Sequence, residues 1–436
     1  MRMSPRRRVL APLALAGVAG IALAGCSGTG GGGSTGDSDN TVTIYGTIAD
    51  TEAELLEQSW ADFESESGID IQYESSKEFE SQIGIRAQGG NPPDIAIFPQ
   101  PGLLADLASR DYLVPAPQGV IDNVNEYWSE DWAAYGTVDG TLYGAPLMAS
   151  VKGFIWYQPA KFAEWGVQPP TTLDELATLT QTIQQKTGKA PWCAGFGSGD
   201  ASGWPGTDWI EDFVLRDSGP DVYDQWVTND VKFTDQPIVD AFDATGEYLL
   251  NPQYVNAGIG DVQSINSTEF GDVATPMVNG DCALTHQASF FDGFITDAGG
   301  TVAEDGDVWA FIMPGASAGE TAVTGGGEIV GAFNSDADTV KVLEYLSSPE
   351  WANSRVSLGG VISANNGLDP SNASSGILEQ AIEILQDPAT TFRFDASDLM
   401  PGAVGTGTFF KGMVAWINGT PVDQVTQQIE AGWPSS

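Results

Sequence analysis

The chain has 436 residues, 42% of them hydrophobic and 10% aromatic, which is the composition of a globular protein with an ample core. Its formal net charge is −42, from 59 acidic and 17 basic side chains. A charge of this sign repels phosphate backbones and disfavours anionic substrates, so it argues against nucleic-acid binding and favours a neutral or cationic ligand.

The first residues have the pattern of a secretory signal peptide. Three arginines, Arg6 to Arg8, precede an apolar run from Val9 to Ala22 that is too short to cross a bilayer. Leu23-Ala24-Gly25-Cys26 resembles the lipobox of bacterial lipoproteins, in which the cysteine receives a diacylglyceryl group. We therefore expect residues 1–25 to be removed and lipidated Cys26 to hold the protein on the outer side of the cell membrane. The alternative is a soluble secreted protein that is cut nearby.

Residues 26–40 read as this lipidated cysteine followed by a flexible linker. Ser27 to Asn40 contains only small and polar side chains, with none that could bury apolar surface. We expect the folded part to begin near Thr41. The 396 residues that follow are enough for two or three domains.

Strands and helices alternate in the first folded segment. We expect strands at 41–45, 69–73 and 94–98, a helix at about 53–63 that starts at a Thr51/Glu54 capping box and stops at Gly68, and a helix at 79–88. Such alternation predicts parallel strands, with ligands bound beyond their carboxyl ends. Gly46, Thr47 and Gln100 follow two of these strands and are candidate ligand residues, although Gln100 also fits an ordinary surface turn.

A second α/β region follows. We expect a strand at 153–157, a helix with a Thr172/Glu175 capping box that ends at Gly188, strands at 308–313 and 328–333, and helices at 337–346, 377–385 and 422–430. Cys193 and Cys282 are the cysteines left after Cys26, and in an oxidising extracytoplasmic setting they predict a disulfide. Two buried free thiols are the alternative.

Several segments, in order along the chain, resemble the extracellular solute-binding proteins of ABC transporters. These are Asn91-Pro92-Pro93-Asp94-Ile95-Ala96, Asp139 to Pro146, Pro169 to Leu176 and Met277 to Ala283. The resemblance implies an α/β, two-lobed periplasmic-binding-protein-like (type II) fold, in which each lobe has a mostly parallel sheet flanked by helices. It places lobe 1 at residues 41–152 and 306–358 and lobe 2 at residues 153–305 and 359–436, joined by a hinge.

Within that family, other segments resemble the alpha-glucoside-binding branch. They are Pro191-Trp192-Cys193, Gly203 to Asp212, Phe98 to Gly102 and His286 to Phe290. This implies a monomeric, non-catalytic receptor that holds an alpha-linked di- or oligosaccharide between its lobes and delivers it to the permease subunits of an ABC transporter. No metal and no cofactor are implied.

Sugars present hydroxyl groups and weakly polar C–H faces, so their sites combine flat rings with short polar side chains. Trp204, Asp208 and Trp209 offer that combination beside several glycines, although a helix start with buried tryptophans is the alternative. Lys152 could donate to a sugar oxygen or form a hinge ion pair. The remaining candidates are, from the resemblance, His286 (the only histidine), Gln287 and Phe290, and from local pattern Gly326 in a close-approach loop, Arg393 with Asp398 as a clamp, and Phe409 or Phe410 as a ring. A structural role is the alternative for His286, and also for the clamp and the ring.

Two other functions remain open at this level. A surface glycosidase acting on alpha-glucosides would need two carboxylates across one sugar subsite. A receptor for a polyamine or a peptide would fit the negative charge, and its binding would weaken at high salt.

Overall fold

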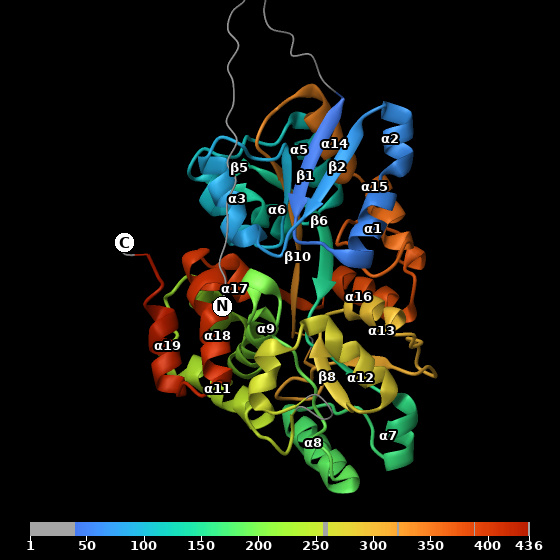
Figure 1. Cartoon of the computed structure of the whole chain (residues 1–436), viewed down its shortest axis with the longest axis vertical. Coiled ribbons are helices and arrows are strands. Elements are labelled where there is room, and N and C mark those ends of the chain that lie inside the picture. The colour runs from blue at the N-terminus through green and yellow to red at the C-terminus, as the bar shows by residue number, and fades with distance from the viewer. Residues whose placement is uncertain (1–39, 256–259, 321, 388, 435–436) are drawn as a thin grey trace, which may run out of the picture. The chain divides into compact units, whose positions relative to one another are not determined.

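The computed structural model describes residues 40–255, 260–320, 322–387 and 389–434. They form a two-lobed α/β fold, as the sequence predicts (Figure 1). The predicted signal peptide, Cys26 and the linker up to Asp39 lie outside the described residues. Within the described ranges, no helix has the length and apolar character that a membrane span requires.

The larger sheet has six strands and carries the parallel strands that the alternating sequence predicts. Strand β1 (Thr41–Gly46) pairs in parallel with β2 (Asp70–Ser75) and β3 (Ile95–Phe98). Strand β10 (Ala322–Ala332) is antiparallel to β3 and to β6 (Gly144–Val151), and parallel to β11 (Thr391–Phe394). The strand order is β11-β10-β3-β1-β2, with β6 on β10.

The smaller sheet differs from the expected parallel arrangement. Strand β7 (Phe154–Tyr157) lies between β8 (Leu284–Gln287) and β9 (Trp309–Ile312), and both pairs are antiparallel because the chain enters β8 and β9 from the opposite end. Strand β9 lies in predicted lobe 1 but pairs with β7 of predicted lobe 2. Likewise, β11 lies in predicted lobe 2 but pairs with β10 of predicted lobe 1. The lobe limits otherwise stay predictions.

Helices surround both sheets (Figure 1). Those beside the larger sheet are α1 (Asp50–Gln58), α2 (Ala61–Ser67), α3 (Phe79–Gln88), α4 (Pro101–Ala108), α5 (Gln118–Tyr127), α6 (Glu130–Tyr135), α14 (Ala337–Leu346) and α15 (Pro349–Ser357), with a small hairpin of β4 (Thr137–Val138) and β5 (Thr141–Leu142). The others are α7 (Pro159–Trp165), α8 (Leu173–Thr187), α9 (Trp204–Phe213), α10 (Pro220–Val227), α11 (Gln236–Leu249), α12 (Ala274–Asn279), α13 (Phe291–Asp297), α16 (Gly376–Gln386), α17 (Ala396–Leu399), α18 (Phe410–Ile417) and α19 (Val422–Glu430).

The two predicted capping boxes have different outcomes. At α8, the Thr172 hydroxyl accepts a hydrogen bond from the Glu175 backbone N–H at 3.2 Å, as predicted. At α1, Thr51 lies inside the helix and Ala49 is the N-cap, so that box is wrong. The helix expected there is also broken in two, because the Ser59 hydroxyl donates to the Leu56 carbonyl at 2.6 Å and competes with the helical ladder.

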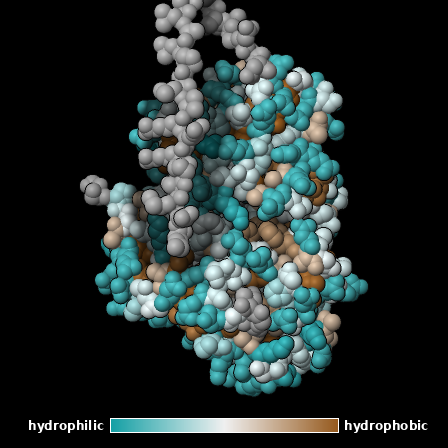
Figure 2. Space-filling view, viewed as in Figure 1, coloured by the Kyte–Doolittle hydropathy of each residue, from teal (hydrophilic) through white to brown (hydrophobic). Residues whose placement is uncertain are grey.

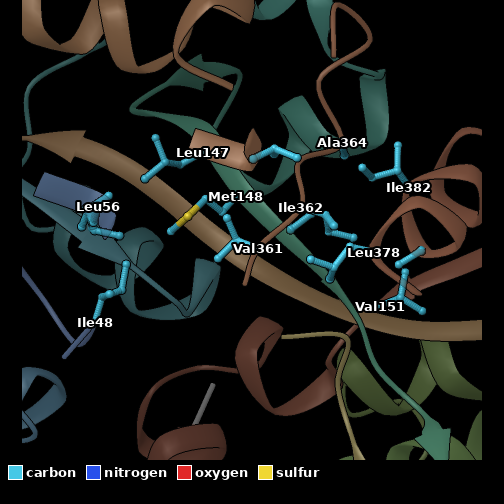
Figure 3. Packing of buried hydrophobic residues seen from close by; sticks show 14 of the residues in the cluster. Ile48, Leu56, Leu147, Met148, Val151, Val361, Ile362, Ala364, Leu378 and Ile382 are labelled. Atoms are coloured by element: carbon cyan, nitrogen blue, oxygen red, sulfur yellow. The ribbon is translucent and has the colours of Figure 1, made fainter. Parts of the chain in front are cut away.

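The strand β6 joins the core of the larger sheet to the rest of the molecule. All eight of its residues are buried. Figure 3 shows the packing around it, where Leu147, Met148 and Val151 of β6 meet side chains from three other segments. These side chains are Ile48 and Leu56, then Val361, Ile362 and Ala364, and finally Leu378 and Ile382 of α16. This packing fixes the point at which β6 ends, which is where the candidate site begins.

A disulfide links Cys193 and Cys282, as predicted, with their Cα atoms 5.7 Å apart. The Cys193 backbone N–H also donates to the Leu284 carbonyl at 2.9 Å, so the bridge anchors the segment after α8 to the strand β8. Figure 2 shows a largely hydrophilic face with apolar residues scattered over it. Among the described residues, the large hydrophobic side chains that are exposed are Ile85 and Leu250.

Candidate functional site

Five buried ionisable side chains meet beside the last residues of β6 and the first half of β10. We call them the Lys152 cluster: Lys152, Asp208, Glu211, Asp395 and Asp398. The Lys152 ammonium lies 3.0 Å from the Asp208 carboxylate and also contacts Asp395. None of the five residues is more than 9% exposed. The cluster therefore holds four carboxyl groups around one cation.

Local structure explains how residues far apart in the sequence reach this point. The Lys152 backbone N–H donates to the Thr324 carbonyl on β10 at 2.9 Å, and the Asp395 N–H donates to Gly325 at 2.8 Å. Asp208 and Glu211 are three residues apart on α9 and so share a helix face. The Ser397 N–H of α17 donates to Glu211 at 2.9 Å, which ties the two helices together.

Burial controls the charge of this cluster. It raises the pKa of Glu211 to about 7, and the neighbouring Asp208 adds to the rise. Burial likewise holds the pKa of Asp208, Asp395 and Asp398 well above the ordinary value, against the opposing effect of Lys152. For Lys152 itself, burial acts to lower the pKa, but the surrounding carboxylates outweigh it and the pKa is raised. At neutral pH the cluster thus presents both hydrogen-bond donors and acceptors.

Three of the carboxyl groups are close enough to share a cation. Oxygens of Asp208, Glu211 and Asp395 lie within 4.8 Å of one another, a spacing at which a metal ion could be held. The Lys152 ammonium already contacts two of these three groups and supplies a positive charge there. The protein's own side chain therefore fills the role that an ion would have in this set.

Aromatic rings lie beside the Lys152 cluster. The Lys152 ammonium is 5.0 Å from the ring centroid of Trp204, at the start of α9. The Trp204 ring packs edge-on against Phe270 and Phe290, with centroids 5.0 and 6.1 Å away. All three rings are partly exposed. Partly exposed rings beside buried polar groups are the combination that a sugar requires.

Gln100 is the N-cap of α4, the helix that follows β3 of the larger sheet and packs against α17. It is 5% exposed, its amide N–H donates to Glu80 at 3.2 Å, and its side-chain oxygen has no hydrogen-bond partner among the described residues. Gly102, in the first turn of α4, lies so close to α17 that an added Cβ would be 3.1 Å from the Asp398 carbonyl. The carboxyl-end rule thus placed Gln100 near Asp398, and the free oxygen can accept from a ligand.

Gly326 also lies at the cluster, but not in the expected loop. Gly325 to Gly327 are central residues of β10 and pair with β6. An added Cβ on Gly326 would lie 3.3 Å from both Asp395 and Lys152. The glycines therefore make room for the cluster at a strand, and the prediction of a loop was wrong.

Two candidates, His286 and Trp209, belong instead to a neighbouring network around Asp212. The His286 ring nitrogen Nε2 lies 2.7 Å from the Asp212 carboxylate, and Trp209 packs on the His286 ring at 4.6 Å. Asp212 also accepts from Arg216 and Thr324. Burial acts to raise the pKa of Asp212, but Arg216 and His286 outweigh it and lower the pKa. The Gln287 side chain accepts from the Ala288 N–H at 3.0 Å.

Two further candidates lie apart from the cluster. The Phe409 ring is fully buried and packs against Trp226 and Phe233, which makes it part of the core. The Arg393 guanidinium forms a two-pronged ion pair with Asp224, at 2.6 and 2.9 Å, rather than a clamp with Asp398. Sequence pattern could not separate these residues from ligand residues, because a buried ring and a sugar-facing ring look alike in sequence.

A second polar group lies at the end of β1, near Gly46 and Thr47. An added Cβ on Gly46 would be 2.8 Å from the Tyr73 hydroxyl, which donates to the Ile48 carbonyl at 2.9 Å. Burial raises the pKa of Tyr73, and Glu52 and Glu328 add to the rise. Both carboxyl groups also act on the guanidinium of Arg355. Sequence analysis missed this group, together with Glu211 and Asp395 of the Lys152 cluster.

Comparison with known proteins identifies the family. The model of the bacterial extracellular solute-binding protein family matches residues 48–353, which is more than half of the chain. The chain belongs to this family. The solute-binding protein is 37% identical over 405 residues to the osmoprotective compounds-binding protein GgtB of Synechocystis, covering 92% of this chain and 94% of GgtB.

Two other known proteins are also similar to this solute-binding protein, one in sequence and one in fold. It is 35% identical over 407 residues to the alpha-glucosides-binding periplasmic protein AglE of Rhizobium meliloti, covering 91% of this chain and 87% of AglE. A solved structure of a chitin oligosaccharide binding protein has the same fold, with a TM-score of 0.76 at 18% identity over 90% of this chain and 97% of that one. The type II fold and the family that the sequence predicts are therefore confirmed.

Proposed function

We propose that this solute-binding protein is the receptor of an ABC importer for an alpha-glucoside or a related di- or oligosaccharide. The observation that carries the proposal is the Lys152 cluster next to the partly exposed rings of Trp204 and Phe290. Buried groups that both donate and accept hydrogen bonds match sugar hydroxyls, and the rings match the C–H face of a sugar. Nothing in this role requires that a bond of the ligand be broken.

The relatives support the same class of ligand. AglE is named for alpha-glucosides, and GgtB is named for osmoprotective compounds. The segment that carries Trp204 and Asp208 is also the one that resembles the alpha-glucoside-binding branch. Sequence and geometry therefore favour a neutral, hydroxyl-rich ligand that occupies the space beside α9.

Capture would depend on contacts from both lobes. Gln100 belongs to the segment of the larger sheet, whereas Asp208 and Trp204 belong to α9. A ligand that binds both sides favours the closed arrangement in proportion to its differential affinity for that state. The permease subunits would then accept the closed, loaded form, while the lipidated Cys26 keeps the receptor beside them.

The lipid anchor has its own test. Cells that express the protein are grown with a labelled fatty acid, and the mature protein is examined for the label. We expect the wild-type protein to carry it and the Cys26→Ala variant to lose it and leave the membrane fraction. A wild-type protein without label would contradict the anchor and support the soluble alternative.

A thermal-shift screen tests the proposed ligand class. A ligand that binds only the folded state raises the melting temperature with its concentration. We expect maltose, trehalose or sucrose to raise it in wild-type protein and in Glu54→Gln, an exposed control, but not in Asp208→Asn. The sugar should be recovered unchanged afterwards. Released glucose would favour a glycosidase instead.

One observation favours a second candidate, a receptor for a cationic solute. The Lys152 cluster has four carboxyl groups and one ammonium, so a ligand amine would find acceptors there. Binding of a cation would weaken as salt rises, whereas binding of a neutral sugar would not. This candidate would be supported if spermidine, but none of the sugars, raised the melting temperature and if that rise disappeared at 0.5 M salt, which is about three times the physiological ionic strength.

A further inference from the structure

Arg355, in α15, is a buried cation whose hydrogen-bonding capacity is largely unused. Its side chain is 0% exposed. Nη1 donates to the Gly359 carbonyl at 2.8 Å, but Nε and Nη2 have no hydrogen-bond partner among the described residues. Buried N–H groups without partners are rare in folded proteins and costly, and for a charged group the cost is higher. These two donors therefore need an explanation.

The acidic neighbours of Arg355 do not supply one. Glu52 of α1 and Glu328 of β10 both act on the Arg355 charge, and they oppose the lowering of its pKa by burial. However, within the described part of the chain no carboxylate oxygen of Glu52 or Glu328 lies within 4.0 Å of an Arg355 nitrogen. Burial raises the pKa of Glu328 to about 7, with Glu52 adding to the rise and Arg355 opposing it. The three side chains thus influence one another electrostatically, although no ion pair joins Arg355 to either glutamate in the described part of the chain.

The Arg355 group lies along the same strand as the Lys152 cluster. Gly326, which borders Asp395 and Lys152, is two residues before Glu328 on β10. Residues i and i+2 of a strand project to the same face, about 7 Å apart. The Lys152 charge also acts on Glu328, where, like Arg355, it opposes the rise in pKa that burial causes. The stretch Gly325 to Gly327 of β10, which carries no side chains, therefore separates the buried Lys152 cluster from buried Arg355 and its two partly buried glutamates.

We propose that Arg355, flanked by Glu52 and Glu328, is a second recognition point of the ligand site, at which Nε and Nη2 donate to a hydroxyl oxygen of a ligand that also contacts the Lys152 cluster. The inference rests on the proposed function, because it needs a hydroxyl-rich ligand. The planar guanidinium offers two donors, and the two carboxyl groups beside it offer acceptors. This arrangement matches two neighbouring hydroxyl groups of a ligand, that is, a diol. A ligand that contacts both Arg355 and the Lys152 cluster must be longer than one that contacts the cluster alone. Arg355 therefore selects for disaccharides or longer sugars.

Calorimetric titration with maltose, trehalose and sucrose tests this role. Four proteins are compared: wild type, Arg355→Met, which keeps an unbranched side chain without donors, Arg355→Lys, and Arg86→Lys as a control. Arg86 forms a partly exposed ion pair with Glu74 and is not a member of the Lys152 cluster or of the Arg355 group. We expect Arg355→Met to lose at least 10-fold in affinity for the sugar that binds wild type, which is the effect of losing a hydrogen bond to a charged donor. Arg355→Lys should lose less, and Arg86→Lys should match wild type.

Thermal unfolding of the ligand-free proteins separates ligand recognition from a structural role. Because wild-type Arg355 leaves donors unsatisfied, we expect ligand-free Arg355→Met to melt within a few degrees of wild type. If Arg355 instead bonds to buried water or to the protein, Arg355→Met will melt far lower, or not fold, while Arg355→Lys keeps wild-type affinity. That result, or an unchanged affinity in Arg355→Met, overturns the inference. If wild type binds none of the three sugars, the proposed function fails first.

Discussion

Glu211 shows how one residue of the site links function to stability. It is fully buried, its Oε1 accepts from the Ser397 N–H, and its Oε2 has no hydrogen-bond partner among the described residues. Its neighbours include Asp208 and Asp398, which oppose its ionisation. Selection for stability alone does not favour four carboxyl groups in one buried cluster, which supports our proposal that a ligand completes this site.

Glu211→Gln should make the protein more stable above neutral pH. Burial raises the pKa of Glu211 to about 7, from 4.5, so the folded state binds more protons than the unfolded state between these values. Stability is therefore lost as pH rises through that window, by about 3 kcal/mol for a shift of this size. Glutamine keeps the bond to Ser397 and removes the titration.

Urea unfolding at pH 5 and pH 8 measures this effect. We expect the difference in unfolding free energy between the two pH values to shrink in Glu211→Gln and to stay as in wild type in Glu54→Gln, an exposed glutamate. The same difference in Glu211→Gln and wild type would show that Glu211 does not hold a proton in the folded protein.

At the scale of elements, the turn between β6 and β7 is a tightly constrained point near the site. Gly153 has φ of +77°, a conformation that side chains other than glycine rarely adopt. An added Cβ would lie 2.5 Å from the Asp212 carboxylate and 3.0 Å from Arg216. The Asp212 network thus rests directly on the segment that leaves the larger sheet.

Gly153→Ala should therefore destabilise the protein by about 2 to 4 kcal/mol, the sum of backbone strain and a displaced buried network. Gly166→Ala is a matched control, because Gly166 has φ of +65° but nothing within 4 Å of an added Cβ. It should cost only about 1 kcal/mol, the backbone part alone. Urea unfolding compares the two variants. Equal costs would show that the Asp212 network can move aside freely.

The disulfide is a second constraint at this scale. Cys193 and Cys282 are 89 residues apart, and the chain-entropy model gives such a loop about 4 to 5 kcal/mol of stabilisation. The double variant Cys193→Ala, Cys282→Ala should lose about this much in thermal or urea unfolding but keep its affinity for sugar. A double variant with full stability would show that the bridge is dispensable.

Much of the fold could be predicted from sequence, because local patterns fix local elements. The bounds of α3, α14 and α19 agree with those predicted from periodicity and capping residues. The site is harder, because it depends on distant segments: Ser397 and Glu211, for example, are 186 residues apart and hydrogen-bonded. Asp208 was found because it lies in a recognisable segment. Asp395 follows a short strand with no such signal, and Arg355 is hidden among core residues.

At the scale of the whole molecule, charge and composition agree with the site. The formal net charge of −42 disfavours anionic ligands, and the face shown in Figure 2 is largely hydrophilic. The polar groups that we assign to the ligand are buried rather than spread over this surface. At the site that we propose, binding is expected to depend on hydrogen bonds and ring contacts in a shielded place, so a neutral sugar would not need the surface charge.

Small-angle X-ray scattering of the purified protein, with and without a saturating sugar from the thermal-shift screen, tests the central claim most directly. If the two lobes close around an intact sugar, the radius of gyration will decrease on addition of the sugar and recover when it is dialysed away. Asp208→Asn should show no change under the same conditions. A wild-type profile that stays the same at saturation would contradict capture by closure.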